Sequence, residues 1–186
     1  FYHVIKPEID FPDEFDHYAP EIYSRGKENF DKMFRDGVFF QDHEECYYIY
    51  AQTMSGRTQY GIVGGASVAD YVNNVIKKHE LTRPDKEEDR KNHVRISRLN
   101  DEPVFFAYPN VPALDQIVYD ITKNAPEYNF VSNDGIGHQF WVVKDKPVIN
   151  QITTLFAAIP ATYVADGHHR TAAAALVGKE RSEKNP

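Results

Sequence analysis

The residues most suited to chemistry lie in a short polar segment near the carboxyl end of the chain, Ala165-Asp166-Gly167-His168-His169-Arg170. A strand-like stretch precedes the segment and an alanine-rich stretch follows it, so we expect a turn between a strand and a helix. Asp166 stands where a helix N-cap belongs, and Gly167 allows a tight bend and the close approach of a ligand. The pattern predicts strand, turn and helix, with the helix start open to solvent in a cleft.

This turn has the composition of an anion-binding site. The first backbone amides of a helix have no partner within the helix, and together with the helix dipole they attract negative charge. Arg170 adds a planar fork that suits phosphate or carboxylate, while His168 and His169 add donors that exchange protons near neutral pH. The plain alternative is a capped helix with two surface histidines. A shared metal ion is disfavoured, because adjacent helical side chains point about 100° apart.

A second polar cluster lies upstream, in the predicted loop His79-Glu80-Leu81-Thr82-Arg83. Residues 85–91 read as an ordinary solvated helix face, whereas the loop concentrates an acid, a base and a cation between two helices. Loops of this kind often carry chemistry. Glu80 is the candidate general base, and Lys78 or Arg83 is a candidate phosphate partner.

The two clusters are expected to meet in space, because both carry residue types that a phosphoryl-transfer site uses. We expect at least one side chain of Lys78, His79, Glu80 or Arg83 within roughly 10 Å of Asp166 or His169, close enough for one ligand to bridge them.

Hydrophobic periodicity and turn signals predict the elements that position these clusters. Helices are expected near residues 20–35, 67–76, 84–100, 114–121, 145–159 and 168–177, the last one stopped by Gly178. Strands are expected at residues 47–53, 58–63, 104–108, 138–143 and 163–165, the first two forming a β-hairpin. Strands and helices mix irregularly, which favours an α+β fold over a regular parallel α/β fold.

Composition narrows the class of protein further. The 21 basic and 28 acidic residues give a net charge of −7, which is unfavourable for a general nucleic-acid binder. The single cysteine, Cys46, fits a reducing compartment, and neither a signal peptide nor a membrane-spanning stretch is visible. We therefore expect a cytoplasmic protein. The missing initiator methionine and the polar residues 179–186 predict one α+β domain from a longer chain, with 179–186 as a tail or linker.

Three stretches of the sequence resemble the domain of unknown function 1015 family of bacteria and archaea. They are Tyr18-Ala19-Pro20-Glu21-Ile22-Tyr23, the segment from Lys77 to Arg90, and Ala165-Asp166-Gly167-His168-His169-Arg170. The last turn is similar to that of the ParB and sulfiredoxin-like superfamily, which includes a free-serine kinase. The resemblance implies an α+β, ParB/sulfiredoxin-like mixed sheet core with inserted helices and a β-hairpin.

The resemblance to that kinase implies a nucleotide-dependent phosphotransferase with ATP or ADP and Mg²⁺ as cofactors. Under this hypothesis the catalytic residues are Glu80, Asp166 and His169, and Asp166 is also the metal ligand. The nucleotide would be held by Gly167, His168, His169, Arg170, Lys78 and Arg83. Sulfiredoxin chemistry is disfavoured, since it needs a reactive cysteine in this turn.

Two other functions stay open. One is a non-catalytic module that binds a nucleotide or phosphate, which needs only the turn. The other is a DNA-associated regulator related to partitioning proteins, which needs a basic face that the net charge of −7 disfavours. An enzyme differs from both because it needs a carboxylate near the phosphate-binding turn. The substrate and the oligomeric state are left open.

Overall fold

The computed structural model describes residues 1–81 and 83–184. Thr82 of the predicted loop and the last two residues of the predicted tail therefore lie outside the described residues. Backbone contacts divide the chain into two compact units. Unit 1 comprises Phe1–Gln41, Ser67–Tyr108 and Ala161–Pro186, and unit 2 comprises Asp42–Ala66 and Pro109–Pro160.

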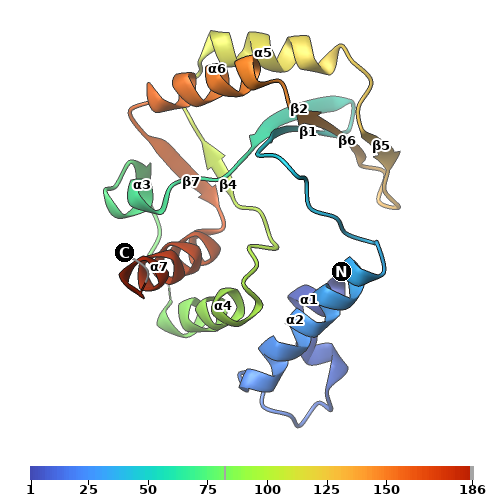
Figure 1. The fold of residues 1–186 in the computed structure, drawn as a ribbon, viewed down its shortest axis with the longest axis vertical. Coiled ribbons are helices and arrows are strands. Elements are labelled where there is room, and N and C mark those ends of the chain that lie inside the picture. Colours follow the sequence, from blue (N-terminus) through green and yellow to red (C-terminus); the bar gives the residue numbers. More distant parts are fainter. Residues whose placement is uncertain (82, 185–186) are drawn as a thin grey trace. The chain divides into compact units, whose positions relative to one another are not determined.

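Unit 1 carries both of the predicted polar clusters. Its elements are α1 (Tyr2–Ile5), η1 (Pro7–Asp10), α2 (Pro20–Arg35), α3 (Val68–Val72), β3 (Ile76–Lys77), α4 (Pro84–Ser97), β4 (Phe105–Ala107), β7 (Thr162–Asp166) and α7 (His168–Lys184) (Figure 1). A three-stranded sheet has the order β3-β7-β4, with β7 parallel to β3 and antiparallel to β4. The middle strand leads directly into the predicted turn, and β4 pairs with it as far as Asp166, whereas β3 pairs only with Thr162 and Tyr163.

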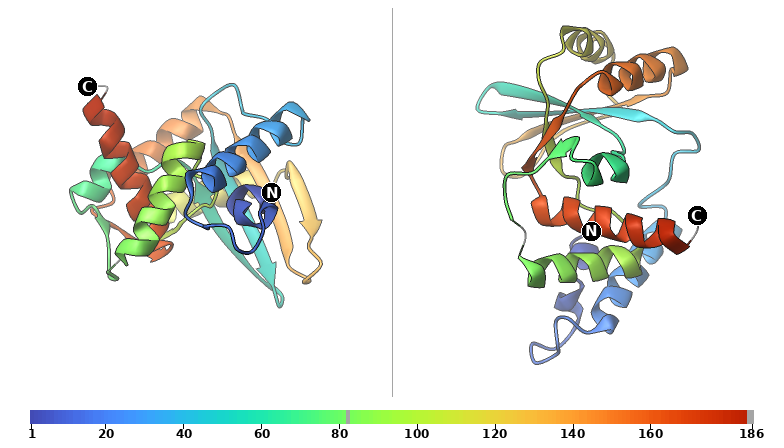
Figure 2. Two further views of the ribbon diagram at one scale, coloured as in Figure 1. Left: turned by 90° about the horizontal axis from the view of Figure 1, so that it is seen from below. Right: turned by 90° about the vertical axis from the view of Figure 1, so that its left-hand side faces the viewer.

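Helix α7 packs beside α4 in unit 1, as both views in Figure 2 show. Its alanines Ala172, Ala173 and Ala175 are buried, and such small side chains allow neighbouring helices to approach closely. Across the same pair of helices, the Arg95 guanidinium donates to both carboxylate oxygens of Glu180, at 3.0 and 2.9 Å. This packing holds α7, whose start carries the candidate site, against α4.

The helix does not stop at Gly178, so that prediction is wrong. It continues to Lys184, and the part of the predicted tail that is described is helical. The reason is a close helix contact: a Cβ at Gly178 would lie 2.7 Å from Cγ2 of Val68 on α3. Gly178 leaves room for a neighbour, and it does not break the helix.

Unit 2 is a four-stranded antiparallel sheet with helices on one face. Its elements are β1 (Tyr47–Met54), β2 (Arg57–Val63), α5 (Pro112–Thr122), β5 (Tyr128–Val131), β6 (Gly137–Val143) and α6 (Lys146–Ala157). The strand order is β2-β1-β6-β5. Alternate residues Ile49, Ala51, Trp141 and Val143 are buried, as expected for a sheet covered on one side. Figures 1 and 2 show α5 and α6 together on that side.

The predicted α+β class and the β-hairpin are confirmed, and most helices lie where periodicity predicts them. Several elements differ, and neither α1 nor η1 is among the predicted helices. The helix expected at 67–76 ends at Val72, after which Asn74 adopts a left-handed φ of 59° and Ile76 enters β3. Strand β5 was not predicted. Its four residues are all exposed, so no alternation of buried and exposed positions marks it.

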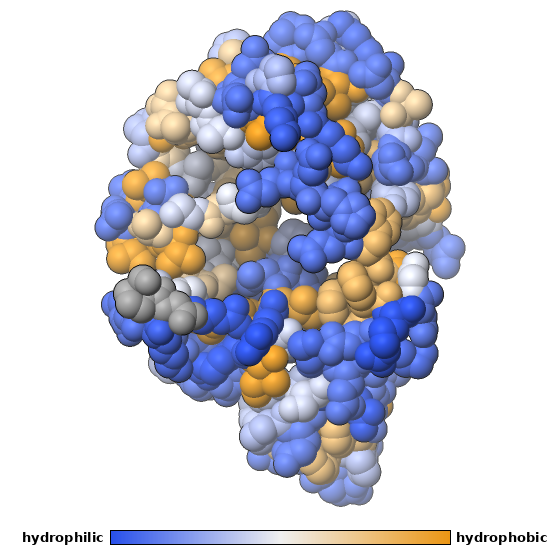
Figure 3. All heavy atoms as spheres, in the orientation of Figure 1, coloured by the Kyte–Doolittle hydropathy of each residue, from blue (hydrophilic) through white to orange (hydrophobic). Residues whose placement is uncertain are grey.

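Hydrophilic residues predominate on the face shown in Figure 3, with groups of hydrophobic residues among them. Among the described residues, every helix is too short or too polar to span a lipid bilayer.

Candidate functional site

The predicted strand, turn and helix are confirmed around residue 167. Strand β7 ends at Asp166, Gly167 forms the turn with a φ of 91°, and α7 begins at His168. Both the amide and the hydroxyl of Thr171 donate to the Gly167 carbonyl at 2.9 Å. The bond from the amide closes the first helical turn, so the amides that precede Thr171 have no acceptor within the helix.

Asp166 is not the N-cap, and that prediction is wrong. It is the last residue of β7, one position too early, and Gly167 occupies the cap position. Its carboxylate instead accepts a hydrogen bond from Nη2 of Arg170 at 2.8 Å. The Asp166 side chain is 74% exposed, so its carboxylate can still be reached from solvent.

The guanidinium of Arg170 makes hydrogen bonds within the protein, and part of the side chain is exposed to solvent. Nη1 donates to the carbonyl of Pro103 at 3.0 Å, while Nη2 donates to Asp166. Two of the five N–H bonds of the fork have acceptors among the described residues, which leaves three for a ligand. The side chain is 28% exposed. Arg170 therefore links the turn to the segment that precedes β4, in addition to the anion contact expected of it.

Gly167 is required by packing against the protein. A Cβ at this position would lie 2.8 Å from Cγ1 of Val104 and 3.1 Å from Nη2 of Arg170. We expected Gly167 to admit a ligand close to the backbone. Its surroundings do not support this expectation. The space beside it is occupied by Val104 and Arg170.

The expected meeting of the two polar clusters is confirmed. The backbone amide of Arg83 donates to Nε2 of His169 at 3.1 Å. Oε2 of Glu80 lies 3.4 Å from Nδ1 of His168. Both histidines of the turn therefore contact the upstream loop, and they do so at different points because their side chains diverge from the helix.

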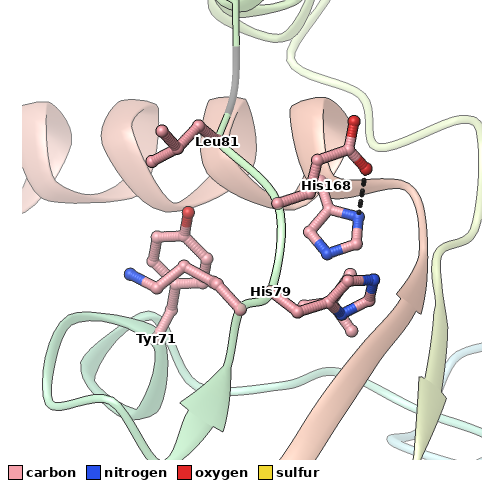
Figure 4. Close-up of a pocket in the computed structure, with 7 residues that line it drawn as sticks. Tyr71, His79, Leu81 and His168 are labelled. Atoms are coloured by element: carbon pink, nitrogen blue, oxygen red, sulfur yellow. Dashed lines mark ion pairs between the residues drawn. The ribbon is translucent and has the colours of Figure 1, made fainter.

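A pocket of about 500 Å³ lies where the loop meets the turn. It is lined by Tyr71, Lys78, His79, Glu80, Leu81, Val164 and His168. Figure 4 shows Tyr71 and Leu81 at one end of this group and the rings of His79 and His168 at the other. The pocket thus combines apolar walls with a carboxylate, an ammonium group and two imidazoles, which is the composition of a small polar ligand site.

His168 is the buried member of this group. Its side chain is 6% exposed. Its ring packs edge-to-face on His79, with 4.4 Å between the ring centroids. Among the described residues, Nε2 of His168 is the one buried side-chain polar atom without a hydrogen-bond partner. Such an atom is unusual in a folded protein and often marks a functional site.

Lys78 and Tyr71 form the opposite wall. Nζ of Lys78 lies 4.0 Å from the centre of the Tyr71 ring, a cation–π contact. Burial raises the pKa of the Tyr71 hydroxyl, which therefore stays protonated and able to donate. Within the described residues Lys78 has no carboxylate partner, so its charge is available to an anionic ligand.

Arg83 contributes its backbone, while its guanidinium is engaged elsewhere. Nη2 of Arg83 donates to Oδ2 of Asp85 at 2.8 Å. This hydrogen bond lowers the pKa of Asp85 below its ordinary value. The predicted phosphate contact of Arg83 would require this exposed pair to separate, and exposed ion pairs are weak.

The described residues contain no group of three or more His, Cys, Asp or Glu side chains that could hold a metal ion. This does not bear on Mg²⁺ bound with a nucleotide, since that ion commonly takes one or two carboxylates and completes its shell with phosphates and water. Asp166, with one carboxylate oxygen on Arg170, fits such a role.

Sequence reasoning did not identify all of the pocket. Helical periodicity places Tyr71 in a helix stripe, and the sequence suggests no role for His79 beyond its place in the loop. The juxtaposition of Tyr71 with Lys78 depends on the early end of α3, for which the left-handed Asn74 gives only a weak signal. No local signal points to the carbonyl of Pro103.

The fold and the site define an α+β protein with a polar pocket beside a strand-to-helix turn. The chain belongs to the family described as Protein of unknown function (DUF1015), whose family model matches residues 1–186. No curated protein and no solved structure matches the chain.

Proposed function

We propose that this protein is a nucleotide-dependent phosphotransferase that acts on a small hydroxyl compound, such as a free amino acid. The observation that carries the proposal is the position of Glu80. Its carboxylate lies 3.4 Å from His168 in the first turn of α7 and lines the adjacent pocket. A module that only binds phosphate needs the turn alone, whereas a phosphotransferase also needs an acid–base group next to it.

The nucleotide phosphates would bind at the start of α7. The first amides of this helix and its dipole attract negative charge, and the remaining N–H bonds of Arg170 add charge-assisted donors. His169 lies at the same end and is held by the Arg83 amide. Lys78, which faces the pocket, would contact either a phosphate or an acidic group of the acceptor.

In the proposed reaction the acceptor hydroxyl lies in the pocket beside Glu80. Its oxygen forms a bond to the terminal phosphorus of the nucleotide while the bond from that phosphorus to the bridging oxygen breaks. The hydroxyl proton passes to the carboxylate of Glu80. The nucleotide leaves with one phosphoryl group fewer, so atoms and charge balance without a further reactant.

Asp166 is the proposed Mg²⁺ ligand, through the carboxylate oxygen that Arg170 does not occupy. The ion would neutralise part of the negative charge of the phosphates. The proposal keeps the ParB/sulfiredoxin-like relationship of the turn, which rests on the Asp-Gly-His-His-Arg sequence. A non-catalytic nucleotide sensor is the second candidate, and it is favoured only by the turn itself.

Calorimetric titration with ATP, ADP and CTP, with and without Mg²⁺, tests the nucleotide site. Arg170→Ala should weaken binding by about 1.5–3 kcal/mol, the value of a hydrogen bond to a charged group. Since Arg170 also holds Pro103 and Asp166, the thermal unfolding of the variant is measured in parallel. Arg25→Ala, which removes an exposed arginine paired with Glu28 on α2, is the matched control and should bind like the wild type.

Transfer of labelled phosphate from the bound nucleotide to a panel of small hydroxyl compounds separates the enzyme from the sensor. Glu80→Gln should keep nucleotide affinity and lose transfer, because the amide cannot accept the proton. Glu88→Gln, at an exposed acid of α4, should leave both unchanged. Binding without transfer by the wild type would favour the sensor, and absence of binding would reject both functions.

A further inference from the structure

His168 lies in surroundings that a phosphate contact alone does not explain. Although it is the first residue of α7, its side chain is turned inward and only 6% exposed. Nδ1 faces Glu80, and the ring of His79 packs edge-to-face against it (Figure 4). These contacts restrict the rotation of the His168 ring and direct one nitrogen toward the candidate base.

The unpartnered Nε2 indicates which nitrogen carries the proton. A neutral imidazole has one donor and one acceptor nitrogen, and its hydrogen bonds determine which is which. A buried N–H without an acceptor is rarer than a buried acceptor without a donor. Since Nε2 has no partner among the described residues, we place the proton on Nδ1, the nitrogen that lies 3.4 Å from Oε2 of Glu80.

Glu80 needs such a partner. Its side chain is 58% exposed and belongs to a loop, so by itself it would sample several rotamers. His168 is the one ion-pair or hydrogen-bond partner of Glu80 among the described residues. His168, by contrast, is fixed by burial and by the rigid helix that carries it. A buried donor on a helix can therefore impose one orientation on an exposed base in a loop.

We infer that His168 is a positioning residue for Glu80, holding the carboxylate in the pocket through its protonated Nδ1. This rests on the proposed function and deepens it, because it changes the role of His168 from phosphate contact to orientation of the base. The nucleotide is held by other groups, so loss of this interaction affects turnover and not nucleotide affinity.

Two carboxamide substitutions separate positioning from simple filling of space. Asn carries its amide nitrogen near the place of Nδ1, whereas Gln carries its amide nitrogen near the place of Nε2. His168→Asn should retain a donor for Glu80, and His168→Gln should lose it. Thermal unfolding identifies any variant that fails to fold. In that case the variant that does fold is compared with the wild type.

Nitrogen NMR of the His168 imidazole tests the inference without any substrate. The expected result is a proton on Nδ1 and a bare Nε2, with a change in the Nδ1 signal in Glu80→Ala. A proton on Nε2, or signals that Glu80→Ala leaves unchanged, would overturn the inference.

Kinetics provide the second readout. His168→Gln should lower kcat by about tenfold to a hundredfold, as misplaced reacting groups do, with KM for the nucleotide unchanged. His168→Asn should recover most of this loss. Equal kcat for both variants and the wild type would overturn positioning. If the wild type transfers no phosphate, the proposed function fails, while the NMR result still decides whether His168 donates to Glu80.

Discussion

The backbone amide of Arg83 donates a hydrogen bond to Nε2 of His169 at 3.1 Å, across 86 residues of sequence. This contact fixes the end of the loop that carries Glu80 to the first turn of α7. The same loop is contacted a second time by His168, through Glu80. Adjacent histidines of one turn thus hold one loop at two points, which is how a flexible segment can present a base in a defined position.

Removal of the hydrogen bond between Arg83 and His169 should increase the mobility of the loop. The stability of the whole protein should change only slightly. His169→Ala deletes one exposed hydrogen bond, so the free energy of unfolding should fall by only about 0.5–1.5 kcal/mol. The Arg83 amide should exchange with solvent faster, as measured by NMR. Amides of β7 serve as the internal control, and equal acceleration there would indicate general destabilisation and contradict this interpretation.

Gly167→Ala should destabilise the protein by about 2–4 kcal/mol in urea denaturation. The φ of 91° is unfavourable for a residue with a Cβ, and that Cβ would collide with Val104 and Arg170. In the double variant with Val104→Ala, the part of the stability loss that comes from the collision should be partly recovered. The part that comes from the unfavourable φ should remain. Gly65→Ala is the control, since its Cβ would meet no atom within 4 Å.

Gly178→Ala tests why α7 continues through a glycine. Alanine is favoured over glycine in a helix by about 1 kcal/mol, whereas the contact with Val68 should offset or exceed this gain. We expect a neutral to destabilising effect in the wild type. With Val68→Ala in the background the same substitution should become stabilising. Stabilisation in both backgrounds would show that the glycine is not required by packing.

The ion pair between α4 and α7 should make stability depend on pH. The hydrogen bonds from Arg95 lower the pKa of Glu180 below its ordinary value of 4.5. A carboxyl group whose pKa is lowered by folding stabilises the protein above the unfolded value, and this contribution disappears as pH falls through the folded value. Glu180→Gln should thus be less stable than the wild type near pH 7.

The difference between the wild type and Glu180→Gln should shrink as pH falls below 4.5, and denaturation at a series of pH values measures it. Glu183→Gln, on the same helix, is the matched control. A difference that stays constant with pH would show that the pair contributes packing and not charge.

Local sequence was sufficient to predict the strand, the turn and the helix around Gly167, because their signals lie within a few residues of each other. The hairpin of β1 and β2 and the helix at 20–35 were predictable for the same reason. The end of α7 was not, since glycine has the same local tendency whether it ends a helix or accommodates a neighbour such as Val68.

The sequence by itself determined the residue types of the candidate site, including the acid in the loop and the histidines in the turn. Their roles were decided by tertiary structure. Only the pairing of distant segments determines that Arg170 binds the Pro103 carbonyl and that His168 is buried against His79. The physical reason is that periodicity reports which face of a helix is buried, whereas the partner of a polar group depends on contacts between segments far apart in the chain.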